Sequence, residues 1–257
     1  MRLDVFLVQN QLASSRTQAQ ALISEHAVYY VNSQGQNVIL NKSSFEVSDD
    51  IASLIQVHPN DLQKYVSRAG LKLESALEHL KLNVAGLVAL DVGQSTGGFT
   101  NCLLQHKVKR VVGLDVGHDQ LHPTLKNDPR VVAIEGLNAK DIEQHAEFKK
   151  QAPAEGFDLM VMDVSFISLT KVVPYLKNYL KPHGQYLFLV KPQFECGAEH
   201  LDKNGVVKNK FVYTQLEENI RHVLTQTFGH VQDYFASGLS GKDGNQEFFI
   251  YGKNLNG

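Results

Sequence analysis

The sequence predicts an α/β protein with a mostly parallel, doubly wound sheet and an antiparallel C-terminal hairpin, preceded by a small α+β domain. From about residue 65 onward, five strand-length apolar runs alternate with helix-length segments, which is the pattern of parallel strands joined by helical crossovers. The first 58 residues instead combine short helical patterns with β-rich runs. A length of 257 residues with 43% hydrophobic content suffices for one full core and a small second domain.

The N-terminal domain is expected at residues 1–58. Apolar residues at helical spacing predict one short helix near 3–7 and a second near 19–23, which Ser14 or Ser15 can cap.

A β-hairpin is expected to follow these helices. Its predicted strands are VYYVN at 28–32 and FEV at 45–47, and SQGQ at 33–36 supplies turn residues between them. The polar, proline-containing stretch at 59–66 is the expected linker to a larger domain at 67–257.

The larger domain opens with an amphipathic helical pattern in SRAGLKLESALEHL. Right-handed crossovers between its strands predict an open, doubly wound sheet. A helix is expected from about Phe211 to Thr227, followed by two strands that a Gly-rich turn joins into the closing hairpin. The predicted strands are 87–92, 110–116, 130–135, 157–164, 184–190, 230–237 and 246–252.

Composition and charge exclude several classes of protein. No segment has the length and apolarity of a secretion signal or a membrane span, so a cytoplasmic protein without a membrane partner is expected. Cys102 and Cys196 are too few for a tetrahedral metal site or a disulfide framework, so no metal is expected. The net charge of -2 argues against wholesale coating of nucleic acid, but allows a local basic surface.

A glycine-rich loop follows the first strand of the predicted sheet. LDVGQSTGGFT carries Gly93, Gly97 and Gly98, which allow a tight turn and close backbone approach ahead of a helix N-terminus. The spacing differs from G-x-G-x-x-G, which disfavours a dinucleotide. Asp115 ends the second strand, where a carboxylate can accept both hydroxyls of a ribose. The alternative is an ordinary tight turn, with Asp115 as a helix cap.

Further charged residues stand at or near predicted strand ends, where ligands of such sheets bind. Asp163 stands just past the apolar LMVM at the carboxyl end of the fourth strand, and Lys191 stands at the end of the fifth, so the two are expected to be neighbours; Pro192 then holds Lys191 in an extended conformation. The alternatives are a helix-capping role for Asp163 and a lysine that reaches from the strand end to solvent. Asp91 is expected to shape the glycine loop, with a cofactor contact as the alternative.

Six ordered motifs resemble those of the TlyA family, also called hemolysin A. They are YVSRAGLKLESAL, ALDVGQSTGGFT, DVSFISL, VKPQFECG, GVV and GNQEF, and the resemblance runs from about residue 2 to residue 251. That family belongs to the FtsJ-like RNA ribose methyltransferases and carries an N-terminal S4 RNA-binding domain. The resemblance therefore implies a Rossmann-like methyltransferase sheet at 67–257 and an S4-like domain at 1–58.

The resemblance also implies an activity and its residues. The expected reaction is methylation of a ribose 2'-hydroxyl by S-adenosylmethionine (SAM), on cytidine in 16S or 23S ribosomal RNA or in both, with ribosomal RNA or ribosomal subunits as partners. The catalytic tetrad of FtsJ-like enzymes carries over to Lys72, Asp163, Lys191 and Glu247. The implied cofactor contacts are Asp91, Gly93, Ser95, Thr96, Gly97, Gly98, Phe99, Asp115, Asn138 and Asp163.

RNA contacts are expected at a few basic side chains. Residues 1–60 carry only three Lys or Arg against five Asp or Glu, so attraction to phosphates depends on clustering of the few cations. The candidates are Arg2, Arg16, Arg68 and Lys208, with Lys203 and Lys210 as further ones. The alternative is that these side chains form a solvated charged surface.

The chemistry expected of Lys191 is to orient the reacting hydroxyl and stabilise the developing alkoxide, while the other three tetrad residues position it. Three other functions compete with a methyltransferase. A membrane-lytic protein lacks a supporting segment in this sequence. A non-catalytic RNA-binding protein would not need the full tetrad, and the loop spacing disfavours a nucleotide-dependent oxidoreductase.

Overall fold

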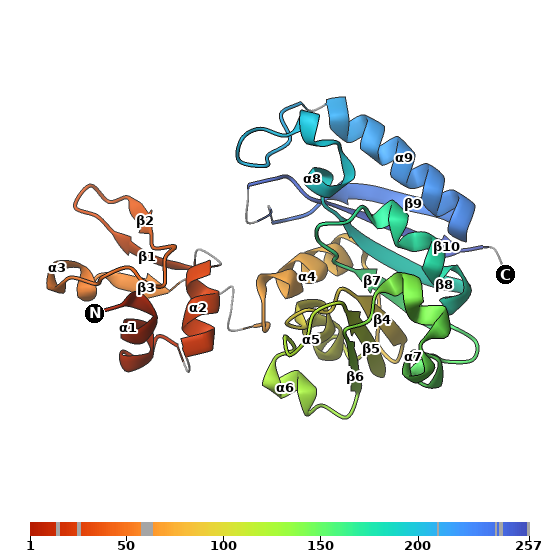
Figure 1. Cartoon of the computed structure of the whole chain (residues 1–257), viewed down its shortest axis with the longest axis horizontal. Coiled ribbons are helices and arrows are strands. Elements are labelled where there is room, and N and C mark those ends of the chain that lie inside the picture. Colours follow the sequence, from red (N-terminus) through yellow and green to blue (C-terminus); the bar gives the residue numbers. More distant parts are fainter. Residues whose placement is uncertain are drawn as a thin grey trace. The chain divides into compact units, whose positions relative to one another are not determined.

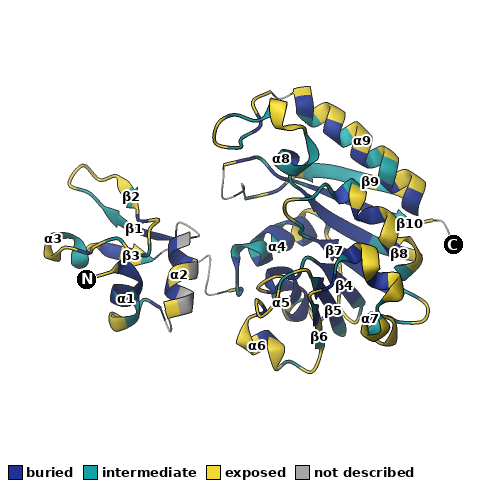
Figure 2. Cartoon of the chain, viewed as in Figure 1, coloured by how far each residue is buried: buried dark blue, intermediate teal, exposed yellow. Residues whose placement is uncertain are grey.

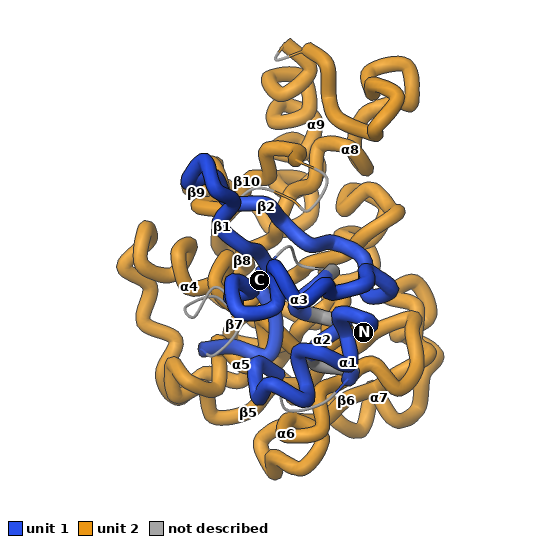
Figure 3. The backbone as a smooth tube through the Cα atoms, turned by 90° about the vertical axis from the view of Figure 1, so that its left-hand side faces the viewer, with its two compact units in different colours: residues 1–68 blue, residues 69–257 orange. Residues whose placement is uncertain are grey.

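The computed structural model describes residues 1–13, 16–24, 27–57, 64–209, 211–239, 241 and 244–255. The chain divides into two compact units, Met1–Arg68 and Ala69–Gly257, coloured separately in Figure 3. Most of the expected linker at 59–66 lies outside the described residues, as do the two predicted capping serines, Ser14 and Ser15, and Lys210.

The first unit packs two helices against a three-stranded antiparallel sheet with the order β2-β1-β3. The helices bury their apolar faces as their spacing predicts: Leu3, Leu7 and Ile23 are at most 1% exposed. The elements are α1 (Leu3–Gln9), α2 (Arg16–Ser24), β1 (Val28–Val31), β2 (Asn37–Ile39), α3 (Asp49–Ala52) and β3 (Ile55–Val57).

The prediction that FEV at 45–47 is the second strand of the hairpin was wrong. The strand paired with β1 is β2, which follows directly after the turn. Asn32 closes that turn, because its Oδ1 accepts the backbone amides of Gln34 and Gln36 at 3.0 and 2.9 Å. Glu46 forms only an isolated bridge with Arg2, so the 45–47 run lies beside the start of α1.

The second unit contains one seven-stranded sheet with the order β6-β5-β4-β7-β8-β10-β9 (Figure 1). The first five of these strands are parallel, and β10 pairs antiparallel with both β8 and β9. This confirms the predicted mostly parallel sheet with an antiparallel C-terminal hairpin. The strands are β4 (Val88–Val92), β5 (Arg110–Asp115), β6 (Val131–Glu135), β7 (Phe157–Met162), β8 (Leu180–Val190), β9 (Gly229–Ala236) and β10 (Phe248–Asn254).

The helices of this unit cover a sheet whose central strands are buried. The pattern is plainest in α9, where Leu216, Ile220 and Leu224 recur every fourth residue and are buried while the outer face is exposed (Figure 2). The helices are α4 (Arg68–Leu80), α5 (Gly98–Gln105), α6 (Pro123–Lys126), α7 (Ala146–Gln151), α8 (Pro192–Glu195) and α9 (Phe211–Phe228), with 3₁₀ helices η1 (Ala139–Gln144), η2 (Leu169–Lys171), η3 (Val173–Tyr179) and η4 (Ala198–His200).

The strand order places a crevice at the carboxyl ends of β4 and β7. From β4 the chain runs outward to β5 and β6, then returns to the other side of β4 as β7. Ligands of open parallel sheets bind at such a reversal of strand order. Among the described helices, none is long and apolar enough to cross a membrane. The described side chains also contain no group of three His, Cys, Asp or Glu arranged to hold a metal ion.

Candidate functional site

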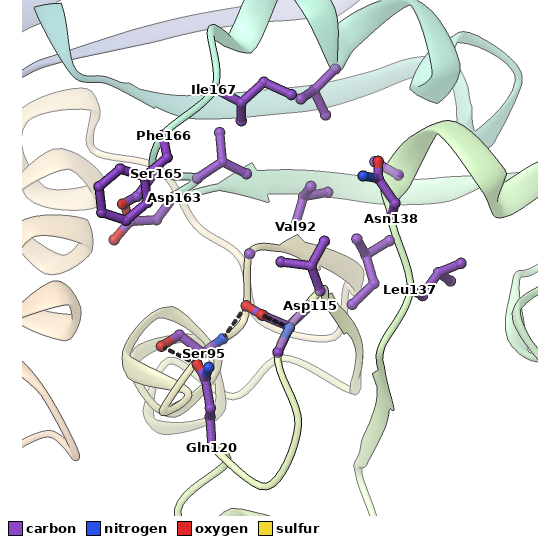
Figure 4. A pocket seen from close by; sticks show the side chains of 17 residues that line it. Val92, Ser95, Asp115, Gln120, Leu137, Asn138, Asp163, Ser165, Phe166 and Ile167 are labelled. Carbon is purple, nitrogen blue, oxygen red and sulfur yellow. Dashed lines mark hydrogen bonds between the residues drawn. The ribbon is translucent and has the colours of Figure 1, made fainter. Parts of the chain in front are cut away.

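A cavity of about 430 Å³ opens at this crevice, a size typical of small-molecule sites (Figure 4). Its walls come from the segments that follow β4, β5, β6 and β7, so the topology itself assembles it. The lining residues are Val92, Gly93, Ser95, Leu114, Asp115, Val116, Gly117, Gln120, Leu137, Asn138, Ala139, Asp163, Val164, Ser165, Phe166, Ile167 and Val172.

Gly93 lies where the β4 loop and the β7 loop approach most closely. Its φ is +82°, and a Cβ placed there would lie 2.6 Å from the backbone oxygen of Asp163. The Gly93 amide donates to the Leu114 carbonyl at 2.9 Å, which ties the turn to β5. Only glycine satisfies both the backbone conformation and the approach.

Gly93→Ala should therefore raise the Kd for SAM more than 10-fold and destabilise the chain by about 2 kcal/mol or more, because the strain of positive φ adds to a backbone clash. The matched control is Gly86→Ala. Gly86 has a φ of +78° but nothing within 4 Å of the added Cβ, so only the conformational strain applies and cofactor binding should be unchanged. Calorimetric titration of SAM and urea unfolding check both effects; equal affinities for SAM in the two variants would contradict the assignment.

Asp115 joins two loops at the floor of the cavity. Its Oδ2 accepts the Ser95 amide at 2.8 Å, and its Oδ1 accepts the Gly117 amide at 2.7 Å. The Ser95 hydroxyl in turn donates to Gln120 Oε1 at 3.0 Å, as Figure 4 shows. The carboxylate is thus held at the end of β5 with one edge on the cavity, in the position expected for a ribose-binding acid.

The other wall of the cavity is mostly apolar. Leu114, Val116, Leu137 and Ile167 supply a surface suited to a flat heteroaromatic ring. Asn138 lies at its edge, where its Oδ1 caps η1 by accepting the Lys140 amide at 3.1 Å.

Five of the predicted cofactor residues do not line the cavity, namely Asp91, Thr96, Gly97, Gly98 and Phe99. Gly97, with a φ of +91°, and Gly98 form the turn into α5, and a Cβ at Gly97 would meet the side chains of Leu121 and Leu125. Phe99 is 2% exposed and stacks on Phe249 with the ring centroids 6.2 Å apart. The carbonyl of Thr96 accepts the His122 amide. The stretch from Thr96 to Phe99 therefore stabilises the glycine loop without lining the cavity.

Asp91 lies beneath the glycine loop in a hydrogen-bonded chain. Its Oδ2 accepts the Thr100 hydroxyl at 2.6 Å, and that hydroxyl accepts Gln94 Nε2 at 2.8 Å. Gln94 fills the space over Gly113 on β5. The Asp91 Oδ1 atom is buried and has no hydrogen-bond partner among the described residues.

Burial raises the pKa of Asp91 to about 7, against 3.8 in the unfolded chain, because the ionised form is desolvated; the Thr100 hydrogen bond opposes the shift. Between pH 3.8 and about pH 7, Asp91 is therefore protonated in the folded state and ionised in the unfolded state. The free energy of unfolding should therefore fall as pH rises from about 4 to about 7, by a few kcal/mol at most. Asp91→Asn should flatten this dependence in urea unfolding at several pH values, whereas the exposed control Asp141→Asn should not; a slope unchanged in Asp91→Asn would count against the assignment.

The four predicted catalytic residues are brought together as two ion pairs. Lys191 Nζ lies 2.5 Å from Asp163 Oδ1 and donates to the Ser165 hydroxyl at 2.8 Å. Lys72 Nζ lies 2.5 Å from Glu247 Oε2. Burial raises the pKa of Glu247, while Lys72 and, more weakly, Lys191 oppose the rise and Asp163 adds to it, so the charge of Glu247 interacts with both ion pairs.

Local structure explains how each charge is presented. Lys191 is the N-cap residue of α8 at the end of β8, in extended conformation, and the buried Pro192 is the first residue of the helix. Lys72 is 9% exposed on α4, and Glu247, which is 3% exposed, precedes β10. Because β10 pairs antiparallel with β8, Glu247 and Lys191 lie at the same end of the sheet.

A half-buried acid that the sequence pattern did not single out joins the loops that follow β7 and β8. Glu195 accepts the Ser168 hydroxyl at 2.5 Å and the Leu169 amide at 2.8 Å, linking the loop after β8 to the loop after β7. Phe166 lies on that second loop with a φ of +65° and is 91% exposed, and its ring packs against Phe194 at 5.1 Å. Such a conformation in a bulky residue is typical of functional loops.

The predicted RNA contacts lie in three places. Arg2 and Arg16 are on the first unit, where both bind Asp4. Arg68 begins α4 and is half-buried. Lys208 and Lys203 are exposed and flank the bridge between Leu201 and Val207. The role of Asp4 escaped the sequence reading because a single acid in an acidic domain carries no signal of its partners.

Comparisons with known proteins agree with this geometry. The FtsJ-like methyltransferase family matches residues 65–254. The chain is 37% identical to "16S/23S rRNA (cytidine-2'-O)-methyltransferase TlyA" of Mycobacterium tuberculosis, over 97% of this chain and 88% of the relative. It is 37% identical to "Hemolysin A" of Brachyspira hyodysenteriae, over 98% and 99% of the two chains. A solved structure from Streptococcus thermophilus superimposes with a TM-score of 0.73 at 31% identity, covering 100% of this chain and 89% of that one.

Proposed function

Because the chain belongs to the FtsJ-like methyltransferase family, in the group of TlyA and hemolysin A, we propose that it transfers a methyl group from SAM to the 2'-hydroxyl of a cytidine ribose in 16S or 23S ribosomal RNA, or in both. Ribosomal RNA or a ribosomal subunit in the cytoplasm is then its partner. The observation that carries the proposal is the double ion pair at the rim of the cavity, in which Lys191 is held by Asp163, a residue that also lines the cavity.

The cavity fits SAM by the chemistry of its walls. Asp115 offers a carboxylate to the ribose hydroxyls, the apolar wall with Val116 and Leu137 suits the adenine, and Asp163 can attract the positively charged end. When bound, SAM would supply an electrophilic methyl group on a sulfonium, with the neutral thioether as the leaving group opposite the attacking oxygen.

The residues of this chain hold the reacting hydroxyl and its developing charge. Lys191 donates to the oxygen and stabilises the alkoxide that forms as the hydroxyl proton leaves to solvent. Asp163 and Ser165 fix the direction of the ammonium group. The Lys72–Glu247 pair helps to position the Lys191–Asp163 pair, because the carboxylate of Glu247 interacts electrostatically with both Lys191 and Asp163.

The surface beside the cavity suits a nucleotide. The ring of Phe166 is exposed at the rim and held by Phe194, so it offers a stacking face for an unpaired base next to the reacting ribose. Sequence-specific RNA recognition usually targets such unstacked bases, which agrees with a single-nucleotide target.

The test is transfer of labelled methyl from SAM to small and large ribosomal subunits that lack ribose methylation, followed by mapping of the labelled nucleotide. Label on the 2'-oxygen of a cytidine in either subunit is the expected result. Binding of SAM with no label on either subunit, or label on a base, would overturn the proposed substrate.

A further inference from the structure

The first unit contains a buried carboxylate that binds two arginines at once. Asp4 is 0% exposed. Its Oδ1 accepts Arg2 Nε at 3.0 Å, and its Oδ2 accepts Arg2 Nη2 at 3.2 Å. The Oδ2 atom also accepts Arg16 Nη2 at 2.8 Å and Gln20 Nε2 at 3.3 Å. This cluster joins the first turn of α1 to α2.

The fold puts these four side chains at one point. Arg2 is the N-cap residue of α1 and Asp4 lies in its first turn, while Arg16 opens α2 and Gln20 follows one turn later. The backbone amide of Asp4 is also tied, to the Ser43 carbonyl at 3.3 Å. The hydrogen bonds from Arg2 and then Arg16 hold the pKa of Asp4 well below its usual range, so the carboxylate stays charged.

Both arginines keep much of their surface in solvent. The side chain of Arg2 is 48% exposed and that of Arg16 is 59% exposed. An unrestrained arginine loses side-chain entropy when it is fixed on a ligand, and an arginine already held by a buried carboxylate loses less. Asp4 therefore holds two planar guanidinium groups in place for an anionic ligand such as a phosphate, whose oxygens can accept paired N–H donors.

The excess of acidic residues in residues 1–60 makes accurate placement of the few arginines and lysines important for RNA binding. Arg2 and Arg16 are two of the three Lys and Arg in residues 1–60, which carry five Asp and Glu. Diffuse attraction to a phosphate backbone is thus weak, and contact depends on placing the few cations well.

We propose that Asp4 is a positioning residue that holds Arg2 and Arg16 together as one phosphate-binding pair for the RNA backbone. The inference rests on the proposed RNA substrate. Net charge alone predicts that removal of an acid from an acidic unit strengthens RNA binding. If Asp4 positions the two arginines, its removal should instead weaken RNA binding.

The experiment compares Asp4→Asn with Asp50→Asn in the full chain; Asp50 is an exposed acid on α3, so both changes remove one negative charge. Binding to an unmodified 16S rRNA transcript is measured at several salt concentrations, together with KM and kcat on ribosomal subunits. Asp4→Asn should weaken binding about 5- to 10-fold, lower the salt slope by about one, and raise KM with kcat unchanged at saturation. Asp50→Asn should bind equally well or more tightly. Equal or tighter binding by a folded Asp4→Asn would overturn the inference.

A second variant covers the case in which Asp4→Asn unfolds the first unit, which circular dichroism would reveal. Arg16→Lys keeps the charge but loses the planar fork, so it should also weaken binding and raise KM; wild-type binding in folded Arg16→Lys would overturn the pairing.

The outcomes separate this inference from the proposed function. If the wild type methylates a subunit while the KM of Asp4→Asn equals that of Asp50→Asn, the inference fails and the proposed function stands. If neither subunit is methylated, the proposed function fails, and the transcript binding alone decides the role of Asp4. A wild type that does not bind the transcript would overturn the role of Asp4 as well.

Discussion

Lys191→Ala should reduce methyl transfer to ribosomal subunits by about 10³-fold or more, while the Kd for SAM stays within about twofold of the wild type. The ammonium group lies 2.5 Å from Asp163 Oδ1 and the Lys191 side chain is 13% exposed, at the rim of the cavity but not among its lining residues. Loss of a preorganised donor to a developing oxyanion costs about 10²–10³ in rate, and loss of the net positive charge beside an alkoxide adds to this. Single-turnover transfer with bound SAM isolates the chemical step.

Two control variants sharpen this result. Lys177→Ala removes an exposed lysine of η3 in the same unit and should leave transfer unchanged. Lys191→Arg keeps the charge but replaces the compact ammonium with a planar fork, so it should restore only a small part of the rate. Equal loss of SAM affinity and transfer in Lys191→Ala would show that the lysine belongs to the cofactor site and not to the reacting hydroxyl.

The Lys191–Asp163 half of the candidate catalytic site was predictable because parallel topology converts sequence position into spatial position. Asp163 and Lys191 each follow an apolar strand, and the carboxyl ends of neighbouring parallel strands meet at one edge. Their pairing therefore followed from the strand pattern, and the pairing found is the expected one. The Lys72–Glu247 pair joins residues 175 positions apart on a helix and an antiparallel strand, so only the resemblance to a family suggested it.

Two kinds of feature could not be predicted from the sequence. One is the choice between two short runs of equal β-propensity, and the other is the direction in which a side chain points. NVI at 37–39 and FEV at 45–47 are both short β-rich runs, and the Asn32 turn decided which one pairs with β1. Phe166 is in the quoted motif DVSFISL, but its positive φ and its exposure are properties of the folded loop. The glycine loop is a further example, because the sequence does not show which of its glycines contacts the cavity. Gly93 lines the cavity, whereas Gly97 and Gly98 form the turn into α5.

Glu247→Ala should destabilise the second unit by about 3–5 kcal/mol and also abolish methyl transfer. The substitution leaves the ammonium of Lys72 uncompensated in a site where Lys72 is only 9% exposed. A buried pair that loses one partner costs this much because the remaining charge has lost its hydration without a counter-ion. The measurement is the urea midpoint of the full chain followed by circular dichroism, beside the single-turnover transfer rate.

A double substitution separates the structural role of this pair from its catalytic role. Lys72→Met with Glu247→Leu replaces the ion pair by apolar groups of similar volume, so stability should return to within about 1–2 kcal/mol of the wild type while transfer stays absent. The half-buried pair Arg221–Glu217, four residues apart on α9, is the matched control, and Glu217→Ala should cost less than about 1 kcal/mol with no effect on transfer. If the double variant recovers both stability and transfer, the Lys72–Glu247 pair only holds the fold, and catalysis rests on Lys191 and Asp163 alone. Recovery of stability without transfer is the expected result, because the charge of Glu247 interacts with Lys191 and Asp163 and not only with Lys72.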